Sequence, residues 1–247
     1  MKSISCPICK IDNSKILFTK NDYKVVKCNR CNLQYVNPQP DDETINEFYN
    51  ANYNTGEMYV RSSHKMKSKF RDSKRNLNRL LKLKKMPTAN YLDIGCSFGY
   101  TVKTAQNYGW NATGIDLNEK AINFAKENFG VDVHLADIFQ IAKQDYYDFV
   151  TMFDVIEHVK DPVKYLEKIY SLLNNGGFFI IGTPDAGHYK ASDESWSDYI
   201  PPEHLFYFNP NTLRQICEMV GFIYVKKYIR SPFRATFKLV FRKRIKQ

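Results

Sequence analysis

The stretch YLDIGCSFGY, residues 91–100, decides the fold of this chain. A run of strand length ends at Asp93 and is followed at once by Gly95 and Gly99 in a G-x-x-x-G spacing. In a doubly wound α/β sheet, the first strand-to-helix turn holds the cofactor beyond the carboxyl end of its strand. A dinucleotide turn would have G-x-G-x-x-G and no acid, because a carboxylate repels a pyrophosphate. The turn therefore predicts a cofactor that is positively charged at this point, through an ammonium or sulfonium group.

Short apolar runs alternate with helical patterns from residue 90 onward. The alternation predicts a parallel sheet with helices on both faces. The predicted strands are 90–94, 111–116, 131–135, 147–153, 176–182, 222–230 and 233–243, and the predicted helices are 99–109, 117–130, 161–176 and 209–221. We expect the helices to end in Gly or Asn caps.

Four of the six cysteines form two C-x-x-C pairs separated by eighteen residues: Cys6, Cys9, Cys28 and Cys31. This spacing is typical of a tetrahedral zinc ribbon in which four thiolates leave no open position for chemistry. The metal would then be structural, and its binding would fold a module too small to have a core of its own. Two disulfides or a duplicated redox pair are the alternatives, and a reducing compartment disfavours the first.

The chain is basic, with 36 Lys and Arg against 26 Asp and Glu and a net charge of +10. Such a balance favours anionic partners: nucleic acid, phosphorylated or nucleotide-linked substrates, or anionic lipid. The excess is concentrated in 62–85, which we predict to be an amphipathic helix with a basic outer face. That face is either simply solvated or a docking surface for an anionic substrate.

Three parts are expected along the chain: a zinc ribbon over 1–40, a helical lid and linker over 41–88, and the α/β domain over 89–247. No apolar run approaches the roughly 18 residues that a membrane-spanning helix needs. The first ten residues reach a cysteine pair without an apolar leader, so we expect neither a signal nor a transit peptide and predict a cytoplasmic protein with no membrane span.

Two further acids end the second and third predicted strands. Asp116 lies about twenty residues beyond the first glycine, where a carboxylate can accept hydrogen bonds from both ribose hydroxyls. Asp137 ends the third strand in the same way. Each acid taken alone is as well explained as a helix N-cap or turn residue, but three acids at three successive strand ends favour a common ligand.

With these motifs the chain resembles the class I S-adenosylmethionine-dependent methyltransferases. The family's first motif is an acid followed by glycines, and Ser97 stands where its middle glycine is commonest. The resemblance implies a Rossmann-like, seven-stranded, mostly parallel sheet and S-adenosylmethionine as cofactor. It implies cofactor contacts from the loop residues Asp93, Gly95, Cys96 and Gly99, from Asp116 with Leu117, from Asp137 with Ile138 against the adenine, and from Tyr53 in the lid.

The acceptor side is predicted past the fourth and fifth strands. The stretch DVIEHV resembles a motif of ubiquinone-type O-methyltransferases, and EHLFYF resembles the Glu-His pair of ribbon-bearing sugar methyltransferases. His204 is the predicted general base, Glu203 orients it or binds substrate, and His158 is the second candidate. A divalent ion at Asp154, Glu157 and His158 is an alternative use of these side chains.

The predicted acceptor is a small, anionic, hydroxyl-bearing molecule, such as a nucleotide-linked sugar or another precursor of a surface glycan. Zinc ribbons and basic helices also serve RNA binding, so an RNA methyltransferase is the second hypothesis, although the ribbon hairpin is not conspicuously basic. A non-catalytic scaffold that binds a partner through the ribbon is the third. The acids at 93, 116 and 137 argue against it, because a scaffold has no need of them.

Overall fold

The computed structural model describes residues 1–45, 47, 63–229 and 235–245. The chain forms two compact units. The first unit comprises Met1–Asn52, Asp154–Glu167 and Ile181–Phe241, and the second comprises Tyr53–Phe153, Lys168–Ile180 and Arg242–Gln247. Tyr53, the predicted lid contact, lies outside the described residues.

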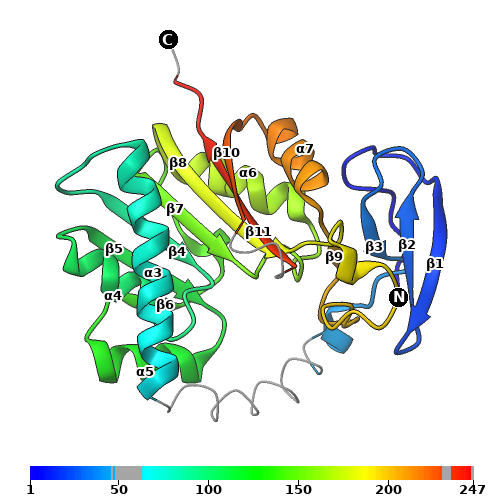
Figure 1. Ribbon diagram of the computed structural model, residues 1–247, viewed down its shortest axis with the longest axis horizontal. Helices are drawn as coiled ribbons and strands as arrows, with labels where there is room; N and C mark the ends of the chain where they lie inside the picture. The colour runs from blue at the N-terminus through cyan, green and yellow to red at the C-terminus, as the bar shows by residue number, and fades with distance from the viewer. Residues whose placement is uncertain (46, 48–62, 230–234, 246–247) are drawn as a thin grey trace. The chain divides into compact units, whose positions relative to one another are not determined.

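The predicted seven-stranded sheet is confirmed (Figure 1). Its strands are β4 (Asn90–Ile94), β5 (Asn111–Asp116), β6 (Val133–Leu135), β7 (Tyr147–Phe153), β8 (Leu173–Pro184), β10 (Ile223–Ile229) and β11 (Thr236–Arg242). They lie in the order β10-β11-β8-β7-β4-β5-β6. Strand β4 pairs in parallel with both β5 and β7, so the strand order reverses between β4 and β7. In an open α/β sheet, this reversal is the place where ligands bind.

The helices follow the sequence pattern closely. They are α3 (Ser63–Leu83), α4 (Tyr100–Asn107), α5 (Glu119–Phe129), α6 (Pro162–Leu172) and α7 (Pro210–Val220), with the short 3-10 turns η2 (Ile138–Gln140) and η3 (Tyr189–Ala191). Gly130 and Gly221 end α5 and α7 in the left-handed conformation, as the predicted glycine caps require. Among the helices of the described ranges, none has the length and apolar character that crossing a membrane requires.

The basic amphipathic helix is confirmed as α3. Leu77 and Leu80 are fully buried on its inner face, and α3 packs against α4 (Figure 1). Its exposed cations are Lys67, Lys69, Arg71, Lys74, Arg75 and Lys82. The inner face therefore anchors the helix, while the outer face carries the concentrated positive charge.

One predicted boundary is wrong. The Asn-Gly stretch at 174–176 was expected to cap α6, but the helix ends at Leu172 and β8 begins at the next residue. The final carbonyls of α6 accept hydrogen bonds from the backbone amides of Asp145 and Tyr146, at 2.9 Å each. The Asn174 side chain donates to Tyr146 O and Asp148 Oδ1 instead of capping the helix. Partners distant in the sequence thus replace the local cap.

A second sheet is built from the N-terminal cysteine region together with a late strand. It has four strands in the order β1-β2-β3-β9, where β1 is Ser14–Lys20, β2 is Tyr23–Cys28, β3 is Gln34–Val36 and β9 is Phe206–Tyr207 (Figure 1). Its core joins Val25 and Val36 to Trp196, Tyr199 and Tyr207. The cysteine region therefore has an apolar core, but residues of the chain beyond 185 supply much of it.

Candidate functional site

Three residues in the loop after β4 have a left-handed backbone conformation. Gly95, Ser97 and Gly99 have φ angles of 70°, 47° and 73°. The amides of Gly95 and Cys96 both donate to Ile115 O, at 2.9 and 3.0 Å, so the loop turns back onto β5. Ser97 occupies the position where the resemblance expected a glycine, and its backbone adopts the conformation that glycine favours. The turn therefore forms with a serine at this position.

The loop approaches β5 so closely that β5 needs a glycine beneath it. A Cβ on Gly114 would lie 2.8 Å from both Cβ and Sγ of Cys96 and 2.7 Å from Cγ2 of Val102. The Cys96 side chain is buried against this surface. Cys96 can therefore contact a cofactor only through its backbone atoms.

Replacing Gly114 with Ala should lower the free energy of unfolding by about 1–3 kcal/mol, the range for overpacking a close-packed site. The loop backbone cannot yield without breaking its bonds to Ile115 O. Urea unfolding measures the effect, and Gly130→Ala is the matched control because a Cβ at Gly130 meets nothing within 4 Å. The control carries the cost of a positive φ without any clash, and a Gly114→Ala variant as stable as the wild type would contradict a steric role for Gly114.

Asp93 is buried at the switch point, with 3% of its surface exposed. Thr151 of β7 lies opposite it in register and donates its hydroxyl to Asp93 Oδ1 at 2.5 Å. The hydroxyl of Tyr91 is in turn hydrogen-bonded to that of Thr151. Burial raises the pKa of Asp93 to about 7, and the hydrogen bonds from Thr151 and Tyr91 oppose this rise only in part. A buried carboxylate held this way is suited to a cationic ligand group.

Asp116 ties the loop to the end of β5. Its Oδ2 accepts a hydrogen bond from the backbone amide of Ser97 at 2.7 Å, and its Oδ1 accepts one from that of Asn118 at 2.8 Å. Burial raises the pKa of Asp116, and these amides oppose the rise. Each carboxylate oxygen has a second lone pair, so both oxygens can still accept a ribose hydroxyl. Asp116 thus has a structural role in addition to its predicted role in ribose binding.

Asp137 caps η2, which is the N-cap role given above as the alternative to ligand binding. Its Oδ1 accepts from the Phe139 amide at 2.9 Å, and the Gln140 side chain accepts from the Asp137 amide. Ile138, the predicted adenine contact, is fully buried, whereas Leu117 is 70% and Phe139 is 55% exposed. Two large apolar side chains exposed beside Asp116 and Asp137 are surfaces on which a flat ring can pack. Phe139 was not singled out from the sequence alone.

His158 and His204 lie together within the first unit. Their ring centroids are 4.7 Å apart in an edge-to-face arrangement. His158 Nδ1 donates to Glu203 O at 2.9 Å and His204 Nδ1 donates to Asp198 O at 2.8 Å, because a carbonyl oxygen can only accept. Burial lowers the pKa of His158 to about 4 and that of His204 to about 3, so both rings are neutral near pH 7. In each neutral ring, Nε2 is then the basic nitrogen.

Glu157 completes this cluster. A carboxylate oxygen of Glu157 and one nitrogen of each histidine all lie within 4.8 Å of one another. Glu157 is 2% exposed, and neither of its carboxylate oxygens has a hydrogen-bond partner among the described residues. Burial and the charge of Asp154 raise its pKa well above the usual value. The raised pKa means that this carboxyl is neutral near pH 7, so it can both donate and accept hydrogen bonds within the cluster.

The predicted catalytic residues do not all point into this cluster. Glu203 contributes its backbone carbonyl to His158, and burial raises the pKa of its own half-buried side chain. The predicted metal set Asp154, Glu157 and His158 is not grouped as such, since the compact set contains His204 in place of Asp154. Glu157 was named in the sequence only as a metal ligand, and its place between the histidines was not foreseen.

The four cysteine sulfurs form a second potential metal site. All four lie within 4.8 Å of one another, and the sulfurs of Cys6 and Cys31 are 3.5 Å apart, too far for a disulfide. Around a tetrahedral zinc with Zn–S bonds of about 2.3 Å, sulfurs are separated by about 3.8 Å. Hydrogen bonds from the Cys31 thiol and from backbone amides lower the pKa of Cys6 to about 5. The donor set fits a thiolate-bound zinc.

Comparisons with known proteins agree with this architecture. The methyltransferase domain family matches residues 63–227, and the chain belongs to this family. The ubiquinone biosynthesis O-methyltransferase of Nitrosomonas europaea is 31% identical over 99 residues, which are 37% of this chain and 42% of that protein. The chain thus matches less than half the length of such curated relatives.

Solved structures show the same fold. A Burkholderia thailandensis 1,6-didemethyltoxoflavin-N1-methyltransferase, with 1,6-didemethyltoxoflavin and S-adenosylhomocysteine bound, has a TM-score of 0.63 at 14% identity, and the match covers 94% of this chain and all of that one. A Haemonchus contortus phosphoethanolamine N-methyltransferase 2 in complex with S-adenosylmethionine has a TM-score of 0.56 at 26% identity, over 64% of this chain and 39% of its own. The fold is therefore that of S-adenosylmethionine-dependent methyltransferases.

Proposed function

We propose that this chain transfers a methyl group from S-adenosylmethionine to a hydroxyl oxygen of a small anionic molecule. The observation that carries the proposal is the buried Asp93 at the switch point of a methyltransferase fold, beside a loop wound by Gly95, Ser97 and Gly99. Asp93 would hold the ammonium group, directly or through water. Asp116 would bind the ribose, and Leu117 and Phe139 would pack on the adenine.

The bound cofactor would supply an electrophilic methyl group on a sulfonium. His204 is the proposed base, because its Nδ1 is occupied by Asp198 O and its Nε2 can accept the acceptor's hydroxyl proton. Removing that proton would make the acceptor oxygen nucleophilic toward the methyl group that the cofactor would supply. Burial disfavours the imidazolium of His204, and the neutral carboxyl of Glu157 would stabilise it by accepting a hydrogen bond through its carbonyl oxygen.

The acceptor class rests on two supports. The curated relatives are O-methyltransferases, which favours an oxygen acceptor, and the net charge of +10 with the exposed cations of α3 favours an anionic one. A nucleotide-linked sugar has both properties. Methyl transfer from radiolabelled cofactor should be measured to nucleotide-linked sugars, to the same sugars without phosphate, and to total RNA. Transfer to RNA alone would replace this acceptor class by the RNA hypothesis.

A structural zinc ion at Cys6, Cys9, Cys28 and Cys31 is part of the proposal. Purified protein should contain one zinc per chain, and Cys9→Ser should lose it while Cys217→Ala, outside the cluster, keeps it. Removing the zinc should cost at least about 4 kcal/mol of unfolding free energy, the stabilisation given by a ligand held at 1,000 times its Kd. Metal analysis and urea unfolding measure both quantities. Metal-free protein of unchanged stability would refute the site.

A further inference from the structure

The cysteine-bearing sheet is joined to the loop that carries His204. Strand β3 pairs with β9, which begins two residues after His204, through Gln34 opposite Tyr207 and Tyr35 opposite Phe206. The amide of Val36 donates to Leu205 O at 2.9 Å. The residues on both sides of this junction belong to the same compact unit. The N-terminal sheet therefore supplies the pairing partner for the segment after His204.

Two side chains of the N-terminal sheet also reach the turn before His204. Gln34 Oε1 accepts a hydrogen bond from the hydroxyl of Tyr199 at 2.6 Å, and Asn21 Nδ2 donates to Pro201 O at 2.9 Å. Tyr199 directly follows Asp198, whose carbonyl accepts from His204 Nδ1. Tyr199 is 1% exposed and packs edge-to-face on Tyr207, with centroids 4.9 Å apart. The carbonyl that orients the His204 ring is thus held next to a tyrosine anchored by Gln34.

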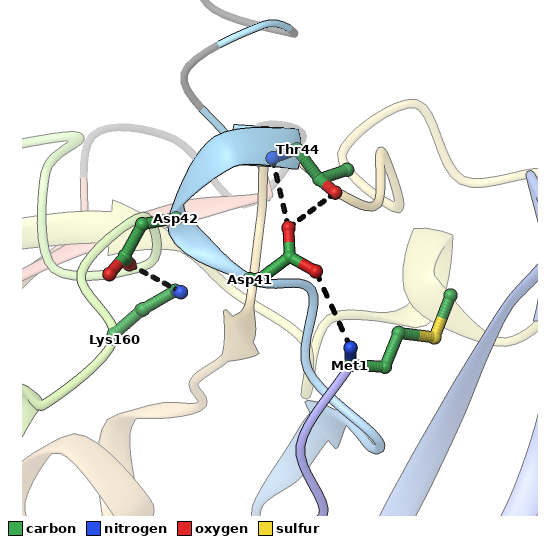
Figure 2. Close-up of polar contacts among 5 residues, drawn as sticks. All are labelled: Met1, Asp41, Asp42, Thr44 and Lys160. Carbon is green, nitrogen blue, oxygen red and sulfur yellow. Dashed lines mark hydrogen bonds and ion pairs between the residues drawn. The ribbon is translucent and has the colours of Figure 1, made fainter.

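The same connections extend to the loop of His158. The amides of Leu205 and Phe206 donate to Glu157 O at 2.8 and 3.1 Å. Lys160 forms an ion pair of 2.5 Å with Asp42, in the segment that follows the N-terminal sheet (Figure 2). Asp41 beside it accepts hydrogen bonds from the amide and hydroxyl of Thr44 and contacts the N-terminal amine of Met1 (Figure 2). Residues 1–44 therefore form hydrogen bonds or ion pairs with both loops, the one that carries His158 and the one that carries His204.

We propose that Gln34 and Asn21 are positioning residues for His204, so that the N-terminal sheet sets the tautomer and orientation of the base. Both side chains form their hydrogen bonds within residues 199–201, between Asp198, which accepts from His204, and His204 itself. Since misplacing a catalytic group by about 1 Å can cost about 100-fold in rate, modest loosening of this turn has a large effect. The inference rests on the proposed function of His204, but its geometry does not depend on the identity of the acceptor.

The test compares Gln34→Ala and Asn21→Ala with Asn29→Ala in the full-length, zinc-loaded protein. Asn29 is the matched control because its side chain bonds to Asn13, on the exposed side of the same region. The ¹⁵N shifts of the His204 imidazole report its tautomer without any substrate. We expect the wild type and Asn29→Ala to show one Nδ1–H tautomer and both test variants to show a tautomer mixture.

With the acceptor found in the screen, kcat should fall about tenfold or more in both test variants, while the KM for S-adenosylmethionine stays within about twofold. Unchanged imidazole shifts in both variants would overturn the inference. If one variant fails to fold, the other decides, because each removes a separate hydrogen bond. Should no acceptor be methylated, the proposed function fails, while the imidazole shifts still decide whether the N-terminal sheet positions His204.

Discussion

Replacing His204 with Ala should lower turnover by about 10²–10⁴-fold, the contribution of a positioned general base. The variant should bind S-adenosylhomocysteine as tightly as the wild type does, since none of the proposed cofactor contacts comes from His204. Single-turnover methyl transfer and calorimetry measure the two effects. His134→Ala is the matched control, because this histidine is exposed and pairs only with the surface carboxylate of Asp132 among the contacts described.

The pKa of His204 also determines how turnover should depend on pH. Its pKa of about 3 means that the ring is neutral and active above that value, so the titration of His204 should not limit the rate between pH 5 and 8. Turnover within about twofold of wild type in His204→Ala would remove this residue from the mechanism. His158, whose Nδ1 is similarly bonded to a carbonyl, would then be the base to test.

The second large effect concerns Asp93. Its pKa of about 7 in the cofactor-free protein means that protonation competes with an ammonium group. Cofactor affinity should be highest above pH 7. Below pH 7 it should fall by up to about tenfold for each pH unit. Asp93→Asn should bind about 10–100-fold more weakly at pH 7.5, the scale for a lost hydrogen bond to a charged group, and should lose this pH dependence.

The same residue should limit the stability of the fold. The pKa of Asp in an unfolded chain is about 3.9, so a folded-state pKa of about 7 favours folding below pH 4, and that advantage is lost as the pH rises through 7. Asp93→Asn should therefore be more stable than wild type at pH 8, although it binds cofactor more weakly. Asp132→Asn, at an exposed carboxylate, is the control for both measurements. Weaker binding together with lower stability would indicate a purely structural Asp93.

Local patterns were sufficient to predict the α/β class, the seven strands and the glycine turn. The acid before the turn and the strand periods are properties of short segments, so they can be read without knowing the partners of each strand. The partners of Asp93 could not be predicted in this way. Thr151 lies 58 residues away, and only the pairing of β4 with β7 and its register bring its hydroxyl to the carboxylate.

The acceptor side shows the same limit. The histidines 158 and 204 were identified individually, but their 4.7 Å ring separation and the carbonyls that fix their tautomers depend on tertiary contacts. The end of α6 was mispredicted because its terminal carbonyls are satisfied by the amides of Asp145 and Tyr146, not by the Asn-Gly sequence that follows. The fourth strand of the N-terminal sheet, β9, was likewise missed, since a pair of residues is too short to carry a period.

The central claim is that the glycine loop and Asp93 bind S-adenosylmethionine, and calorimetry of the purified, zinc-loaded protein tests it most directly. Titration with S-adenosylmethionine and with S-adenosylhomocysteine should each give saturable binding at one site per chain. NADH, whose pyrophosphate is repelled by an acid at this turn, should give none. Binding of both sulfur compounds would support the methyltransferase assignment and leave only the acceptor to find. A folded protein that binds neither would contradict it and make a non-catalytic scaffold the leading interpretation.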